Sequence, residues 1–210
     1  MIKFKHMGWV LAAGIAGTMA GTGFQAKNDK YGVVDLSEVF SSSDFAKSQT
    51  DSLRNLSTQR QDLLQFANTY PVFSAEQAQR FRELGVKPQP TAPEKAEIDK
   101  IKTDVMAQNK KFMDLQVKAQ PTPDEVALLR EFNDRTQSMV KNIDRWAREF
   151  GDELSGMQDK LRKDTLERVK TAVQEVGTKQ GYTIIYVQDI VPYSANNVTA
   201  DSLKAMNAKK

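Results

Sequence analysis

The sequence contains no cysteine, and its only histidine is His6. Disulfide bonds, thiol nucleophiles and typical zinc sites are therefore excluded, as is histidine-based acid–base catalysis beyond the first residues. The glycine patterns GxGxxG and GxxxxGK[ST], which cradle phosphates, are also missing. Acidic pairs such as Asp124 and Glu125 fall within expected helices, where the helix dipole already explains them. We predict that the protein is not an enzyme and needs no cofactor or metal.

Glycine and proline are scarce, with 11 and 7 copies in 210 residues. This scarcity favours long uninterrupted helices over a sandwich or barrel with many turns.

The net charge of the chain is small, because it has 30 Lys and Arg residues and 27 Asp and Glu residues. If Lys3 and Lys5 are removed with the N-terminal segment described next, 28 basic residues are left. A nucleic-acid-binding protein would show a strong basic excess. We therefore expect no nucleic acid among the partners.

The first residues have the pattern of a signal peptide. Lys3 and Lys5 precede the uncharged stretch 7–20, which at about 14 residues is too short to span a bilayer core of roughly 30 Å comfortably. Small residues between 20 and 26 offer cleavage sites, so residues 1–26 are predicted to direct export of the chain and to be removed. The alternative is an uncleaved anchor, which would hold the protein at the membrane.

Strand signals occur only near the two ends of the remaining chain. The β-branched run 31–36 and the run 182–187 each predict a strand, and a second short strand is expected at 190–194. Gly181 is expected to stop a helix before the second run, and Thr199 to cap a final helical turn. Single short strands need partners, so residues 27–43 and 181–210 are expected to form one small β body with open edges that favour self-association. The residues expected to build this oligomerisation body are Val33, Val34, Asp35, Leu36, Val39, Phe40, Ile184, Ile185 and Val187.

Asp35 is unusual because it is a charged residue beside an apolar run. It could make a polar contact that fixes the register of the assembled body. It could equally mark the end of the strand, where it would point at water.

The middle of the chain, residues 44–180, reads as a helical hairpin in several pieces. Ser74, Thr91 and Thr122 each begin a capping box, in which a hydroxyl residue is followed three positions later by Glu or Gln. Together with the prolines, these caps predict breaks near 71–74, 85–93 and 120–123. The tip of the hairpin could lie at 86–93 or at 120–123, and in the second case part of the outgoing limb must double back.

Apolar residues within the predicted helices recur at alternating steps of three and four, the spacing of a coiled coil. The last helix, expected at 124–180, shows phase slips at 150–154 and 161–166, where its partner should change. Trp146 and Phe150 fit core packing better than contact with a binding partner. The first helix has polar residues at core positions, such as Arg60. These residues predict a helix that is loosely packed or that lines a wet cavity. The alternative is an ordinary amphipathic helix with some exposed contacts.

The order of these pieces resembles the Skp/OmpH family of periplasmic chaperones. The motifs that carry the resemblance are Gly32-Val-Val-Asp-Leu-Ser-Glu-Val-Phe40, Lys179-Gln-Gly-Tyr182, Ile184-Ile-Tyr-Val187, Val191-Pro-Tyr193 and Val198-Thr-Ala-Asp-Ser-Leu203. The fold class implied is mainly α: a long helical hairpin, or tentacle, projects from a few short strands contributed by both chain ends, and trimerisation completes the body.

The resemblance also implies a function. Members of this kind form homotrimers and hold unfolded outer-membrane proteins, without ATP, in a cavity between the tentacles. The near-neutral charge departs from the strongly basic members of the family. The alternative hypothesis is a coiled-coil scaffold of the cell envelope that holds no clients.

Overall fold

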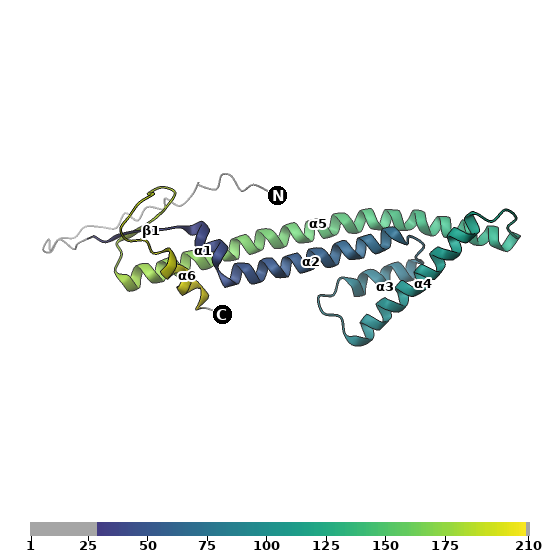
Figure 1. Cartoon of the computed structure of the whole chain (residues 1–210), viewed down its shortest axis with the longest axis horizontal. Coiled ribbons are helices and arrows are strands. Elements are labelled where there is room, and N and C mark those ends of the chain that lie inside the picture. Colours follow the sequence, from purple (N-terminus) through teal and green to yellow (C-terminus); the bar gives the residue numbers. More distant parts are fainter. Residues whose placement is uncertain (1–28, 209–210) are drawn as a thin grey trace, which may run out of the picture. The chain divides into compact units, whose positions relative to one another are not determined.

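The computed structural model describes residues 29–208, so the predicted signal peptide at 1–26 lies outside the described residues. The described chain divides into two compact units, which we call the end unit (29–48 with 162–208) and the middle unit (49–161). The helices are α1 (Leu36–Ser42), α2 (Asp44–Thr69), α3 (Ala75–Gly85), α4 (Ala92–Gln116), α5 (Pro123–Gln180) and α6 (Thr199–Asn207), and the strands are β1 (Tyr31–Val34) and β2 (Ile184–Val187). The predicted fold class, mainly helical with a small sheet from the two chain ends, is confirmed (Figure 1).

The sheet of the end unit joins the two ends of the chain. β1 and β2 pair in parallel, with Tyr31 opposite Ile184 and Val34 opposite Val187. The strand predicted at 190–194 is wrong, because a turn follows β2 directly and Pro192 has no N–H to give to a ladder. The other edge of β1 is instead met by residues 196–198, where Val33 donates to the Asn196 carbonyl at 2.9 Å.

The core of the end unit is small and made mostly of β-branched residues. It brings together β1, α1, the last turns of α5 and α6, and its buried members are Val34, Val39, Val169, Ala172, Val176, Val198 and Met206. Residues from both ends of the sequence therefore share one core, which holds the short strands in place.

The long helix α5 ends at a glycine, as predicted. Gly181 has a φ of 69°, a left-handed conformation that side chains other than glycine adopt at a cost. Tyr182 donates to the Gly177 carbonyl at 2.9 Å, and Gly181 donates to the Thr178 carbonyl at 3.4 Å. This pair of bonds is the Schellman motif, and it turns the chain from α5 toward β2.

In the middle unit the outgoing limb doubles back, as one of the two hairpin alternatives required. α3 returns along α2: Phe66 and Phe81 have ring centroids 5.4 Å apart, and Gln59 donates to the Gly85 carbonyl at 2.8 Å. α4 then runs beside α3, tied by the Arg80–Glu97 ion pair at 2.7 Å (Figure 1). The turn between α4 and α5 at 117–122 is therefore where the chain reverses into α5.

α4 and α5 pack as an antiparallel pair near that turn. Phe112 and Phe132 have ring centroids 5.6 Å apart, and Arg135 donates to Gln108 at 2.7 Å. Further along α5, Trp146 and Phe150 are 2% and 4% exposed, so they belong to the core as predicted. The buried residues of this core are Leu63, Ala67, Val72, Phe73, Ala78, Phe81, Ile101, Val105, Phe112, Leu115, Phe132, Met139, Trp146 and Phe150.

The phase slips predicted in α5 coincide with a gap in its buried residues. After Phe150 the next buried α5 residue is Thr165, which lies in the end unit. Two separate cores therefore use α5, and the helix crosses from one to the other between these two positions.

Candidate interaction surfaces

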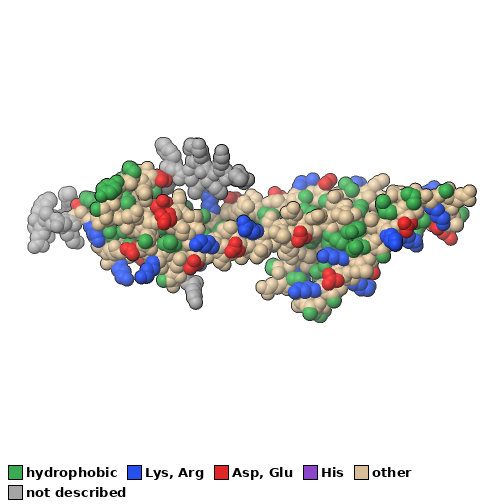
Figure 2. Space-filling model, in the orientation of Figure 1, with side chains coloured by type: hydrophobic (Ala, Val, Ile, Leu, Met, Phe, Trp, Pro, Cys, Tyr) green, Lys and Arg blue, Asp and Glu red, His purple; other side chains and the backbone are tan. Residues whose placement is uncertain are grey.

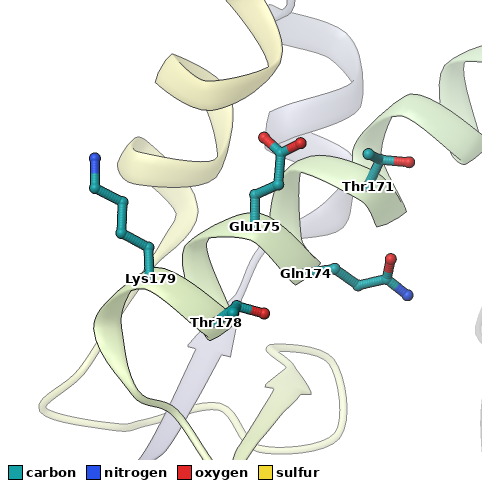
Figure 3. Close-up of a pocket in the computed structure, with 5 residues that line it drawn as sticks. All are labelled: Thr171, Gln174, Glu175, Thr178 and Lys179. Carbon is teal, nitrogen blue, oxygen red and sulfur yellow. The ribbon is translucent and has the colours of Figure 1, made fainter.

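Residues 29–208 contain no group of three side chains that could hold a metal ion, and none of their helices is long and apolar enough to cross a membrane. A shallow depression of about 350 Å³ lies on α5, lined by Thr171, Gln174, Glu175, Thr178 and Lys179. These side chains leave one stretch of helix in different directions and do not converge on a common point (Figure 3).

The residues predicted to build the oligomerisation body divide into an inner and an outer set. Val33, Val34 and Val39 are buried in the end unit, whereas Ile184 is 43% exposed. Four others are half-buried, namely Leu36, Phe40, Ile185 and Val187. Within the single chain, most of the predicted residues thus stabilise the end unit itself.

Asp35 marks the end of β1, as one of the two alternatives held, but the expectation that its side chain only points at water is wrong. Its carboxylate accepts a hydrogen bond from the Glu38 N–H at 2.9 Å, which makes it the N-cap of α1. Its own N–H donates to the Thr199 hydroxyl at 2.8 Å. The prediction that Thr199 caps the last helix is likewise wrong, because the cap position is Val198 and the Thr199 hydroxyl serves Asp35.

An apolar group of side chains lies on the surface of the end unit, and we call it the outer patch. Figure 2 shows hydrophobic side chains gathered at the surface near β1 and the loop that follows β2. The Tyr31 and Tyr186 rings lie 6.4 Å apart across the two strands. The members of the outer patch are Tyr31, Ile184, Tyr186, Ile190 and Tyr193.

Only Ile184 of the outer patch was singled out from the sequence. The alternation of β2, with Ile184 and Tyr186 exposed and Ile185 and Val187 half-buried, is the signal that would have identified Tyr186. Ile190 and Tyr193 were assigned to a strand that does not form, so their exposure could not be anticipated.

The capping residues lie at the starts of three helices of the middle unit. Ser74 accepts from the Gln77 N–H at 3.2 Å and donates its own N–H to the Gln77 side chain at 3.0 Å. Thr122 and Glu125 make the same exchange at the start of α5. At the start of α4, the Glu94 carboxylate accepts from the N–H and the hydroxyl of Thr91 at 2.8 and 3.0 Å.

Two of these caps also hold the loops that precede them. Lys87 forms an ion pair with Glu94, and this contact together with the Thr91 N–H lowers the pKa of Glu94 to about 2. Lys118 lies 2.6 Å from Glu125 and, with the Thr122 N–H, lowers the pKa of that carboxyl as well. Each of the loops 86–91 and 117–122 is therefore tied by a charge-assisted contact to the helix that follows it.

Arg60, which the sequence predicted to be a polar residue at a core position, forms an ion pair with Glu153. Arg60 is 4% exposed and binds Glu153 through two hydrogen bonds of 3.0 Å. Its guanidinium also lies 5.1 Å from the centre of the Phe150 ring. This packing joins α2 to α5 at the position of Arg60.

Methionine and valine side chains on α4 and α5 are exposed on the surface of the middle unit. Met106, Met113 and Val140 are 45%, 55% and 50% exposed. The sequence reading did not single them out, because it followed only the residues at core spacing.

Comparison with known proteins gives one result that covers nearly the whole described chain. A model of the family described as "Outer membrane protein (OmpH-like)" matches residues 30–206. A search of individually curated proteins gave no match. The matched range contains both strands and every helix of the structure except the last residue of α6. The chain therefore belongs to the OmpH-like family, a family of periplasmic chaperones.

Proposed function

We propose that this protein is an ATP-independent holdase chaperone that binds unfolded outer-membrane or other exported proteins. Three copies would assemble through their end units, and clients would be held in a cavity between the helical tentacles. The observation that carries this proposal is the OmpH-like match over residues 30–206. Holding by several weak contacts needs no bound nucleotide, because the contacts together provide a high effective concentration.

The end unit supports self-association for a physical reason. Its sheet has two strands of four residues each, and such a small sheet has little stability of its own. In the described chain β2 has a strand partner on one side only, and the outer patch leaves large apolar side chains in water. Contact with other copies would cover both features.

Export to the periplasm is part of the same proposal. Residues 1–26 would act as the signal peptide, with cleavage between 20 and 26. Mass spectrometry of the protein from its native envelope would test this point. A mature N-terminus between residues 21 and 27 is expected, and an intact start at Met1 would indicate a membrane-tethered form instead.

The proposal is tested by light scattering on a size-exclusion eluate, with and without a urea-unfolded outer-membrane β-barrel protein. The expected result is a mass of three chains that rises by one client when the client is present. A trimer that ignores the client would instead favour the scaffold hypothesis, which predicts a folded partner recoverable by crosslinking. A monomer would contradict the assembly itself.

A further inference from the structure

The methionines of the described chain divide into an exposed and a buried set. Met106, Met113 and Met157 are 45%, 55% and 42% exposed, and we call them the exposed methionines. Met139 and Met206 are 1% and 3% exposed, and we call them the core methionines. One core methionine belongs to the core of the middle unit and the other to the core of the end unit. The same thioether group therefore occurs in two contrasting environments of one chain.

The two exposed methionines of α4 lie beside its buried side and not within it. Met106 directly follows the buried Val105, and Met113 directly follows the buried Phe112. The seven positions between the two methionines make about two helical turns, so their side chains share one side of α4 and are about 10 Å apart along its axis. A polar atom added to either thioether would stay in water and would leave the packing of the buried neighbours unchanged.

Met157 lies in the part of α5 that belongs to neither core. None of the residues 151–164 is buried. At the neighbouring Gly156 an added Cβ would meet nothing within 4 Å, so little packs against the helix here. A change in the polarity of the Met157 side chain would therefore disturb no buried contact.

Methionine is the oxidisable sulfur group of this chain, because the sequence has no cysteine. Thioethers are common sites of oxidation in proteins, and exposure decides which of them react. In the net reaction with hypochlorous acid, the sulfur gains one oxygen atom and is oxidised by two electrons. The O–Cl bond breaks, the chlorine leaves as chloride, and one proton is released. The product is methionine sulfoxide, which is more polar than the thioether.

We propose that the exposed methionines are modification sites, at which hypochlorous acid forms sulfoxides without loss of the fold or of assembly. The core methionines keep their thioethers in the folded protein, because the oxidant does not reach their sulfur atoms. The chain thus consumes oxidant at positions where a polar group is tolerated. This inference does not depend on the proposed holdase function. The exposed methionines belong to the middle unit, whereas the residues assigned to assembly belong to the end unit.

The test is treatment of the purified protein with hypochlorous acid, in an amount of one equivalent per exposed methionine. Peptide mapping by mass spectrometry measures, at each methionine, the fraction that has gained the mass of one oxygen atom. We expect this fraction at every exposed methionine to be at least about tenfold higher than at Met139 or Met206. The matched control is the same treatment in concentrated urea, where the core methionines should react to the same extent as the exposed ones.

Variants identify the groups that take up the oxygen. The triple variant Met106→Leu, Met113→Leu and Met157→Leu should gain almost no oxygen from the same amount of oxidant. Met139→Leu removes a core methionine instead, and it should gain as much oxygen as the wild type. Equal gains by the two variants would contradict the proposal, and so would an exposed methionine that stays unoxidised in the wild type.

Two measurements on the treated wild type decide whether the sulfoxides are tolerated. Circular dichroism should show the helix content of the untreated protein, and light scattering should give the same number of chains. A loss of helix or a changed number of chains would overturn the inference, because the modified side chains would then take part in the fold or in a contact between copies.

Discussion

At the scale of single residues, the burial of Arg60 shows how a charge can occupy a core position. A buried guanidinium without a partner is costly, and here Glu153 supplies a bidentate contact while Phe150 provides a ring surface. One of its N–H groups, at Nη1, has no hydrogen-bond partner. The pair therefore fixes how α2 and α5 meet more than it contributes net stability.

Removal of one partner of this pair should be far more harmful than removal of both. Glu153→Gln leaves Arg60 buried without its counter-charge, and we expect a loss of about 2 kcal/mol in the free energy of unfolding, since Glu153 is partly exposed. Replacement of both residues, Arg60→Met with Glu153→Leu, should stay within about 1 kcal/mol of the wild type. Urea unfolding followed by circular dichroism measures both. Equal losses for the single and double variants would show that packing, and not the lone charge, sets the cost.

Two glycines, Gly156 within α5 and Gly181 directly after its end, are expected to respond in opposite directions to alanine. At Gly156 an added Cβ would meet nothing within 4 Å, so Gly156→Ala should stabilise the helix by about 0.5–1 kcal/mol through its better helix propensity. At Gly181 the left-handed φ of 69° makes alanine unfavourable, and Gly181→Ala should cost about 1 kcal/mol. The midpoints of thermal unfolding of the two variants should therefore move to opposite sides of the wild type. A fall at Gly156 would mean that this exposed position contacts another copy or a partner.

At the scale of elements, local signals in the sequence predicted the helices well. Capping boxes, prolines and Gly181 act through neighbours within a few residues, and the helix starts at Ala75, Ala92 and Pro123 follow them directly. The buried side of α4 and of α5 could be predicted from the spacing of their apolar residues for the same reason. A pattern within one helix already states which side is buried.

Contacts between distant segments could not be predicted in this way. The return of α3 along α2 depends on an aromatic group that includes Phe66 and Phe81, and no repeat in the sequence pairs them. Asp35 reads as a polar interruption of a strand until Thr199, 164 positions away, is placed against its N–H. The sequence shows a charged residue at the core position of Arg60, but it does not show the partner, because Glu153 lies 93 positions further along the chain.

The loop before α4 should depend on pH through Glu94. Because the pKa of this carboxyl is lowered from 4.5 to about 2, its stabilising contacts with Lys87 and Thr91 are fully present above pH 4.5 and are lost as the pH falls toward 2. Glu94→Gln should therefore be less stable than the wild type at neutral pH, and the difference should shrink through that acidic range. An NMR titration of the Glu94 side chain gives the pKa directly. Lys87→Met should raise it, and a wild-type midpoint near 4.5 would show that the contact is absent in solution.

At the scale of the whole molecule, the end unit and the middle unit differ in the size and composition of their hydrophobic cores. The middle unit buries large aromatic residues such as Trp146 and Phe150 in a core of its own. The end unit has a smaller core of mostly valine, alanine and methionine, and it leaves the outer patch exposed. By this reasoning the middle unit is the part more able to fold within one chain, and the end unit is the part that gains more from assembly.

This difference predicts that assembly is lost by a change confined to the outer patch. Tyr186→Asp places a charge among apolar side chains of β2 that are in water in the single chain, so the chain's own core is not touched. If copies bury this patch against one another, the charge loses its hydration there, and light scattering should show single chains where the wild type shows three. Ala200→Asp adds the same charge at an exposed α6 position outside the patch and should leave the mass unchanged. A Tyr186→Asp protein that still has the mass of three chains would place the contact between copies elsewhere on the end unit.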